Sequence, residues 1–120
     1  MKKLVCGSLV ALMLLAASSV SMASYVDFTL YNDSGYTITY WYVSPDYSNS
    51  WEEDVLGSNV LYSGSSMYLN IPDYYDNYCY WDIKIILETG DEAQWSGVDL
   101  CSVGAVTVYV QGNGIYADMQ

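Results

Sequence analysis

Histidine and arginine are absent from this sequence of 120 residues, and lysine occurs only three times, as Lys2, Lys3 and Lys84. Without a basic patch the chain cannot neutralise a row of phosphates, so nucleic-acid binding of the usual electrostatic kind is excluded. Without histidine it also lacks the usual general base near neutral pH and the commonest transition-metal ligand. No glycine-rich loop leading into a helix pattern is present to hold a phosphate. We therefore expect a protein that is not an enzyme.

Acidic and aromatic residues are abundant instead. Fourteen aspartates and glutamates give a formal net charge of −11, and 14 tyrosines and 4 tryptophans raise the aromatic content to 16%. A hydrophobic fraction of 52% argues against disorder, because it supplies enough apolar surface to form a core. The length allows a single domain.

The first 23 residues have the pattern of an export signal. A short positive stretch, Met1 to Lys3, precedes an apolar run from Leu4 to Ala17, and Ser21 and Ala23 are the small residues of a cleavage site. The run is shorter than the roughly 20 residues that span a bilayer, so a retained anchor is disfavoured. We predict cleavage after Ala23, a domain over residues 24–120, no membrane insertion after cleavage, and a bacterial protein that is periplasmic or extracellular.

Signal removal also simplifies the charge and the cysteines. One lysine remains against fourteen carboxylates, a net charge of −13, and Cys6 is lost. Two cysteines in an exported domain most often form one disulfide, so we predict the pair Cys79–Cys101, which would stabilise the fold by roughly 3 kcal/mol. A zinc site would need further cysteine or histidine ligands, and none remain.

Apolar residues alternate with a period of two along the mature chain, which predicts strands. We expect the first two strands to form a hairpin across the turn signal Asn32–Gly35. One segment, Ser44–Ser58, is expected to be irregular, with a single helical turn at Glu52–Leu56. The prediction is an all-β fold, a single antiparallel β-sandwich of 6–8 short strands with one disulfide; a barrel is the alternative. The expected strands cover residues 25–31, 36–43, 67–71, 79–88, 93–100 and, as the last one, 106–110.

A set of residues along the chain resembles a pattern found in an uncharacterised family of small secreted bacterial proteins. The resemblance implies an exported β-sandwich and brings no established activity or catalytic residue with it. Glu52 follows Trp51 where many members have glycine, so this loop is more acidic. The pattern comprises Asn32, Ser34, Gly35, Ile38, Val43-Ser44-Pro45, Trp51, Asp54-Val55-Leu56-Gly57, Leu61, Gly64, Cys79-Tyr80-Trp81-Asp82-Ile83 and Val98-Asp99-Leu100-Cys101.

The irregular segment Ser44–Ser58 is rich in oxygen ligands. Asp46, Glu52, Glu53 and Asp54 form a candidate Ca²⁺ site, because hard cations prefer carboxylate and carbonyl oxygens. Further ligands are expected from Asp73 and Asp76 or from Asp91 and Glu92, in loops at the ends of the sandwich. The spacing does not fit an EF-hand, and a solvated acidic loop on an acidic protein explains the same residues.

Aromatic residues cluster in two stretches of the sequence, one over residues 40–51 and the other over residues 74–80. Exposed aromatic rings beside Asp and Asn suit sugar rings, and tyrosine-rich surfaces also suit protein partners. Ordinary cross-strand packing is the alternative, especially for Trp41 and Trp81, which we expect in the core. The candidate partner-binding residues are Tyr47, Trp51, Tyr74, Tyr75 and Tyr78.

The sequence thus favours an exported, non-catalytic module that binds a protein or a glycan through acidic, tyrosine-rich loops. A calcium-dependent structural or adhesive module is the second hypothesis. The third is a glycan hydrolase using Glu52 or Glu53, which is disfavoured because a domain this small rarely forms a deep cleft. No particular oligomeric state is favoured.

Overall fold

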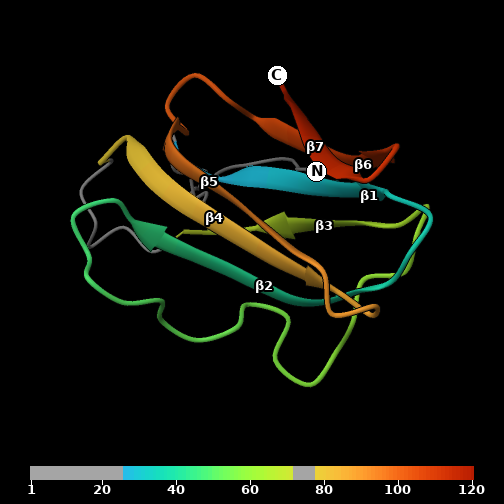
Figure 1. Cartoon of the computed structure of the whole chain (residues 1–120). Helices are drawn as coiled ribbons and strands as arrows, with labels where there is room; N and C mark the ends of the chain where they lie inside the picture. Colours follow the sequence, from blue (N-terminus) through green and yellow to red (C-terminus); the bar gives the residue numbers. More distant parts are fainter. Residues whose placement is uncertain (1–25, 72–77) are drawn as a thin grey trace, which may run out of the picture.

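The computed structural model describes residues 26–71 and 78–120, which form seven strands and, within these ranges, no helix. Two sheets lie one above the other, as Figure 1 shows, so the predicted all-β, two-sheet architecture is confirmed. The described residues contain no helix that could span a membrane. The strands are β1 (Phe28–Asp33), β2 (Ile38–Pro45), β3 (Ser66–Leu69), β4 (Tyr80–Leu87), β5 (Glu92–Asp99), β6 (Ala105–Gln111) and β7 (Gly114–Met119).

The four-stranded sheet has the order β3-β1-β6-β7, and the three-stranded sheet has the order β2-β4-β5. All pairs of neighbouring strands are antiparallel except β1 and β6, which run parallel with Leu30 opposite Val106. This pair departs from the predicted, purely antiparallel arrangement. Strands β1 and β6 are far apart in sequence, so no hairpin fixes their relative direction.

The predicted hairpin between the first two strands is wrong, because β1 and β2 belong to different sheets. Asn32 is fully buried where the chain leaves β1, and its side-chain amide donates to the carbonyl oxygens of Tyr36 and Leu61, each at 2.8 Å. Its Oδ1 accepts the backbone N–H of Ser34 at 3.0 Å. These bonds guide the chain across the end of the core into the second sheet instead of turning it back beside β1.

The strand β7 lies beyond the last predicted strand, which ends at residue 110. A tight turn at Gly112 and Asn113 joins β6 to β7, with Gln111 opposite Gly114. Glycine and asparagine between two alternating stretches are the usual signal for such a hairpin. Gly112 has a φ of 62°, which a residue with a side chain rarely adopts.

The core lies between the sheets and contains the residues that the alternation places inward. On β4, Trp81, Ile83, Ile85 and Leu87 are buried, as predicted. Trp41 is also buried, and its ring meets Phe28 of the other sheet edge to face, with centroids 5.6 Å apart. Among the described residues, the buried hydrophobic side chains of the core are Val26, Phe28, Leu30, Ile38, Trp41, Val43, Leu56, Leu61, Ile71, Trp81, Ile83, Ile85, Leu87, Val98, Leu100, Val106 and Val108.

The predicted disulfide is confirmed. Cys79 and Cys101 are bonded, with Cα atoms 5.0 Å apart, at the end of the β4–β5 ladder. Beside the bond, the Leu100 N–H donates to the Cys79 carbonyl oxygen at 2.8 Å, which extends the ladder by one pair. The disulfide thus fixes the end of the sheet at which β2 finishes and β4 begins.

Candidate functional site

The outer face of the three-stranded sheet is shaped by the chain segment that follows β2. This segment runs along β2 on the side opposite β4 (Figure 1). The backbone N–H of Trp41 donates to Asp54 Oδ1 at 2.9 Å, and the Trp41 carbonyl oxygen accepts the backbone N–H of Val55 at 2.8 Å. Further along, Ile38 and Leu61 form an isolated antiparallel bridge. The segment thereby covers the free edge of β2, which would otherwise be open to pairing with another strand.

The helical turn predicted at Glu52–Leu56 is wrong. Residues 51–54 have no regular structure, and a hydrogen-bonded turn follows at residues 55–58. In that turn the Gly57 N–H donates to the Asp54 carbonyl oxygen at 3.1 Å, and Gly57 has a φ of 62°. Asp54 Oδ1 accepts the Leu56 N–H at 3.1 Å. The carboxylate therefore stabilises an Asx-type turn, the local alternative to a helix that aspartate favours.

The four carboxylates proposed as calcium ligands do not form one group of ligand atoms, although Glu52, Glu53 and Asp54 line the same cavity. Asp54 binds backbone N–H groups, Asp46 Oδ1 accepts the Tyr78 hydroxyl at 2.6 Å, and Glu52 and Glu53 are exposed. Among the described residues, the single group of three potential ligand atoms within 4.8 Å is Cys79, Asp99 and Cys101, whose cysteines are already bonded to each other.

The additional ligands proposed from other loops are not at the same place. Asp91 and Glu92 lie at the β4–β5 turn, whereas Asp46 follows Pro45, which pairs with Trp81 at the opposite end of β4. Asp73 and Asp76 lie outside the described residues. The structure therefore does not bring Asp46, Glu52, Glu53 and Asp54 into one ligand group with Asp91 or Glu92.

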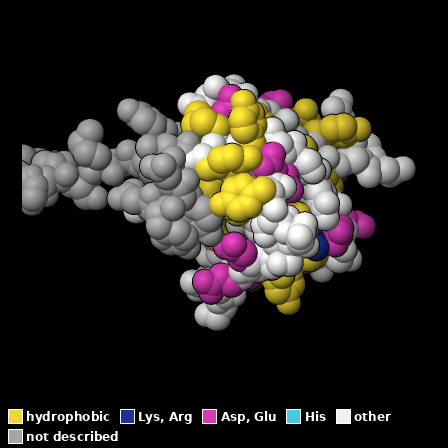
Figure 2. Space-filling model, turned by 90° about the vertical axis from the view of Figure 1, so that its left-hand side faces the viewer, with side chains coloured by type: hydrophobic (Ala, Val, Ile, Leu, Met, Phe, Trp, Pro, Cys, Tyr) yellow, Lys and Arg dark blue, Asp and Glu magenta, His cyan; other side chains and the backbone are white. Residues whose placement is uncertain are grey.

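Three tyrosines meet where β2 ends and β4 begins, and we call them the tyrosine cluster: Tyr47, Tyr78 and Tyr80. The rings of Tyr47 and Tyr78 are 5.1 Å apart and those of Tyr78 and Tyr80 are 6.2 Å apart, both edge to face. Tyr47 is 63% exposed and Tyr80 is 48% exposed. Figure 2 looks at this side of the molecule and shows hydrophobic side chains gathered together with acidic ones beside them.

The central tyrosine of the cluster is held by a carboxylate. The hydrogen bond from the Tyr78 hydroxyl to Asp46, together with desolvation, raises the pKa of Tyr78 from 10.0 to about 12. The phenol is therefore a fixed hydrogen-bond donor at neutral pH, and its ring supports both neighbouring rings. Tyr47 and Tyr78 of the predicted binding residues thus lie side by side, while Tyr74 and Tyr75 lie outside the described residues.

Trp51, the remaining predicted binding residue, belongs to a second group of rings on the same face. Its ring lies 6.2 Å from that of Tyr42, and the Tyr42 ring stacks on Tyr40 at 6.2 Å. Lys84 of β4 places its Nζ 5.5 Å from the Tyr42 ring centroid and 5.8 Å from that of Trp51. This arrangement, the aromatic row, contains the one lysine that follows the predicted signal sequence and holds its charge against ring faces.

A hollow of about 220 Å³ lies between the tyrosine cluster and the aromatic row. The chain segment after Tyr47 forms one wall, and outward-facing residues of β4 and β5 form the other. Ser44 is the direct neighbour of Asp82 across the sheet, and the Asp82 Oδ1 accepts the Gly97 N–H at 2.9 Å. The lining residues are Ser44, Ser48, Asn49, Ser50, Trp51, Asp82 and Gln94.

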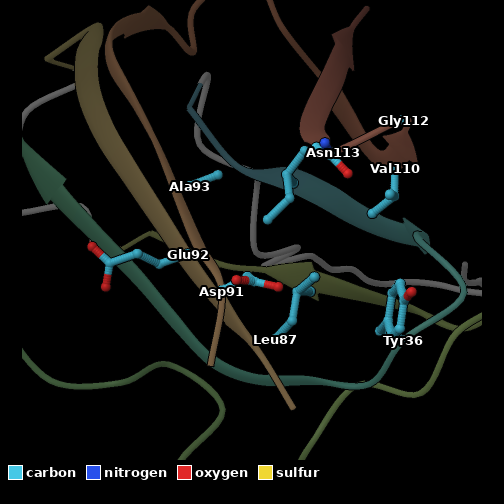
Figure 3. Close-up of a pocket in the computed structure, with 9 residues that line it drawn as sticks. Tyr36, Leu87, Asp91, Glu92, Ala93, Val110, Gly112 and Asn113 are labelled. Atoms are coloured by element: carbon cyan, nitrogen blue, oxygen red, sulfur yellow. The ribbon is translucent and has the colours of Figure 1, made fainter. Parts of the chain in front are cut away.

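Two larger cavities offer less convergent chemistry. One, of about 460 Å³, has Glu52, Glu53 and Asp54 beside apolar residues such as Trp81. The other, also about 460 Å³, lies at the far end of the sandwich between the β4–β5 and β6–β7 turns. Figure 3 shows Glu92 directed away from the other labelled side chains there, and Asp91 Oδ2 accepts the Thr89 hydroxyl at 2.9 Å. Each lining also includes one aromatic residue, but Trp81 of the first cavity is buried in the core, and Tyr36 of the second lies at the opposite end of the sandwich from the tyrosine cluster.

Sequence reasoning missed several residues of this face as site residues. Their signal was alternation: on β2 and β4 the residues between buried neighbours face outward, and apart from Ile86 these are aromatic or polar. Nothing in the sequence marks Gln94 as a site residue, because only the pairing of β5 with β4 places it beside the hollow. The missed residues are Tyr40, Tyr42, Tyr80, Asp82, Lys84 and Gln94.

Comparison with known proteins gives information on the fold. No protein-family model matches the chain, and no curated protein is matched either. The structure is similar to the NMR structure of a protein from Eubacterium rectale, with a TM-score of 0.54 and 14% sequence identity over 78% of this chain and 85% of that one. At this identity the similarity shows a shared fold and carries no information on function.

Proposed function

We propose that this protein is an exported, non-catalytic binding module, which engages a protein or glycan partner through the outer face of its three-stranded sheet. The tyrosine cluster carries this proposal. Tyrosine and tryptophan are enriched in binding surfaces because they bury a large area at a small cost in side-chain entropy. Here the rings of Tyr47 and Tyr80 are exposed, and both contact the ring of Tyr78. The hydrogen bond from the Tyr78 hydroxyl to Asp46 holds that ring in place.

Export is supported by two features. Residues 1–23 have the charged, apolar and small-residue regions of a signal peptide. The Cys79–Cys101 disulfide suits an oxidising compartment such as the bacterial periplasm or the exterior. A net charge of −13 after signal removal would keep the domain soluble there and would weaken binding to strongly acidic surfaces.

The absence of catalysis is supported by the surroundings of the acidic residues. A glycoside hydrolase needs two carboxyl groups that flank one bond of the substrate, in addition to a cleft that holds the sugar. Asp54 accepts hydrogen bonds from the backbone N–H groups of Trp41 and Leu56, and Asp46 accepts one from the Tyr78 hydroxyl. Asp46 and Asp54 are thus engaged in structural hydrogen bonds, and Glu52 and Glu53, the residues of the hydrolase hypothesis, are exposed on the surface.

The test compares two matched pairs of tyrosines. Tyr47→Ala with Tyr80→Ala removes the exposed rings of the cluster, while Tyr31→Ala with Tyr116→Ala removes rings of 43% and 48% exposure from the opposite sheet. Immobilised protein is incubated with separated protein and polysaccharide fractions of the source organism's cell envelope. We expect a fraction to be retained by the wild type and the control pair, and its retention to fall at least tenfold with the cluster pair.

Two results would contradict the proposal. One is that neither envelope fraction is retained by the wild type. The other is that the cluster pair and the control pair behave alike, which would mean that exposed tyrosines in general, and not this face, are responsible for retention. Circular dichroism of each variant verifies that the fold is unchanged.

A further inference from the structure

The hollow between the tyrosine cluster and the aromatic row has a distinct composition. Apart from Trp51, every residue that lines it carries a polar side chain. Its volume of about 220 Å³ is below the roughly 300–1,000 Å³ of pockets for drug-sized ligands. The space thus suits one small polar unit, such as a single sugar ring, and is too small for a folded peptide element.

We infer that this hollow is a subsite for one neutral hexose ring of a glycan chain, with Trp51 as the stacking surface and Asp82 and Gln94 as the hydrogen-bonding residues. The inference rests on the proposed binding function and names its ligand class.

Sugar hydroxyls both donate and accept hydrogen bonds, so a sugar subsite needs both kinds of partner. The carboxylate of Asp82 accepts, and the amide of Gln94 offers one acceptor and two donors. The Asp82 Oδ1 is bonded to the Gly97 N–H, which fixes the orientation of the carboxylate. Ser48 shapes the opposite wall, because its hydroxyl donates to the Ser50 carbonyl oxygen at 2.8 Å. The polar wall is therefore in place before any ligand arrives.

The aromatic ring of the hollow is also held in place. Trp51 lies against Tyr42 and Lys84, at 6.2 Å between ring centroids and 5.8 Å from Nζ to the indole. The C–H groups of a sugar ring carry a small positive charge, which the negative face of an indole attracts. A ring that is already supported loses little freedom when a ligand stacks on it, so stacking there is more favourable than on a mobile side chain.

Charge decides in favour of a neutral sugar. Asp82 lines the hollow, and the Lys84 ammonium is engaged with two aromatic rings instead of standing in the hollow. Lys84 is also the sole basic side chain that remains after signal removal, against fourteen carboxylates. An acidic sugar would meet repulsion that no cation in the hollow offsets, whereas a neutral sugar can use the same carboxylate as an acceptor.

The neighbours of the hollow extend it in two directions. Tyr47 directly precedes Ser48 of the wall, and Tyr80 lies two residues before Asp82 on the same face of β4. On the other side Tyr42 contacts Trp51 and stacks on Tyr40. Aromatic surfaces on both flanks fit the next units of a chain, so a polysaccharide or oligosaccharide is expected to bind more tightly than a free monosaccharide.

The experiment is native affinity electrophoresis of the exported, disulfide-bonded protein in gels that contain one polysaccharide each. The neutral probes are dextran, laminarin, mannan and galactomannan, and the acidic probes are alginate and polygalacturonate. We expect at least one neutral polysaccharide to retard the protein and neither acidic one to do so. Gln94→Ala should weaken retardation by about threefold to tenfold, the effect of one lost hydrogen bond.

Matched controls separate the hollow from the rest of the surface. Gln111→Ala removes an exposed glutamine from β6 of the other sheet and should leave retardation unchanged. Asp82→Asn keeps an oxygen acceptor for the Gly97 N–H and tests the charge, and Trp51→Ala should abolish retardation. Because Trp51 also contacts Tyr42, the decisive variants are Gln94→Ala and Asp82→Asn, which alter outward-facing strand residues.

The inference is overturned if no neutral polysaccharide retards the wild type, if acidic ones do so equally, or if Gln94→Ala and Asp82→Asn both bind like the wild type. These outcomes differ from failure of the proposed function. If an envelope protein is retained through Tyr47 and Tyr80 while no polysaccharide binds, the binding function stands and the sugar subsite is rejected. If neither the envelope fractions nor the polysaccharides bind, both are rejected.

Discussion

Replacing Asp54 tests whether its carboxylate holds the segment after β2 against the edge of β2 or binds a cation. One oxygen, Oδ1, accepts two backbone N–H groups, from Trp41 at 2.9 Å and from Leu56 at 3.1 Å. Trp41 is fully buried, and its backbone N–H has the Asp54 carboxylate as its hydrogen-bond partner. Asp54→Ala removes both bonds, whereas Asp54→Asn keeps an oxygen at the same position and removes the charge.

The expected magnitudes follow from these two contacts. A hydrogen bond to a charged group contributes about 1.5–3 kcal/mol, and a buried N–H without a partner costs about 1–3 kcal/mol. Because the two bonds share one oxygen, we expect Asp54→Ala to lower the free energy of unfolding by about 2–4 kcal/mol. Bonds to a neutral oxygen are roughly half as strong, so Asp54→Asn should lose only about 1 kcal/mol.

The assay is urea unfolding followed by tryptophan fluorescence, with Glu53→Ala as the exposed control that should change stability by less than about 0.5 kcal/mol. Each unfolding curve is repeated in millimolar Ca²⁺ and in EDTA, and we expect the two midpoints to coincide. Equal destabilisation by Asp54→Asn and Asp54→Ala would refute the hydrogen-bond argument. If Ca²⁺ also stabilised the wild type by about 2–3 kcal/mol and neither variant, Asp54 would be a cation ligand.

Three further predictions concern single contacts. When the absorbance of tyrosinate is followed as the pH rises, Tyr78→Phe should remove absorbance change near pH 12 and none near pH 10. The raised pKa of Tyr78 stabilises the folded state below pH 10, and this stabilisation should be lost as the pH rises through about 12. Asn32→Asp should cost roughly 3 kcal/mol at pH 7, where a carboxylate would face two carbonyl oxygens, and less near pH 4, where a protonated acid can donate; a loss independent of pH would contradict this. Reducing Cys79–Cys101 should cost about 3 kcal/mol in a denaturant curve, and an unchanged midpoint would show that β4 and β5 need no cross-link.

Six of the seven described strands, β1 to β6, could be predicted because burial of one face imposes a period of two on their residues, whereas β7 was not predicted. On β4, outward-facing Asp82 and Lys84 alternate with inward-facing Ile83 and Ile85. Only a strand, in which successive side chains point to opposite faces, buries these isoleucines and exposes the charged residues between them. The assignment of strands to sheets could not be predicted in the same way. The turn signal after β1 is real, but the buried Asn32 bonds to Leu61, which is 29 residues away, and this contact leads the chain into the other sheet.

The candidate site was predicted only in part, for a related reason. Tyr47 and Tyr78 were recognised as members of two separate aromatic stretches, and the pairing of β2 with β4 brings these stretches together. The acidic residues near Tyr47 suggested a common metal site because they are close in sequence. In the structure Asp54 binds the backbone and Asp46 binds Tyr78, and neither role is visible from composition.

The segment after β2 performs two tasks, which links the stability of the fold to the proposed binding surface. Its Asp54 and Val55 cover the edge of β2, while its residues Ser48 to Trp51 form a wall of the hollow. The Glu52 N–H, which donates to the Ser44 hydroxyl at 3.2 Å, lies between these two parts. A substitution that loosens the cover on β2 must therefore also displace the wall. We expect Asp54→Ala to weaken glycan retardation without touching the ligand, and Asp54→Asn to preserve both binding and fold.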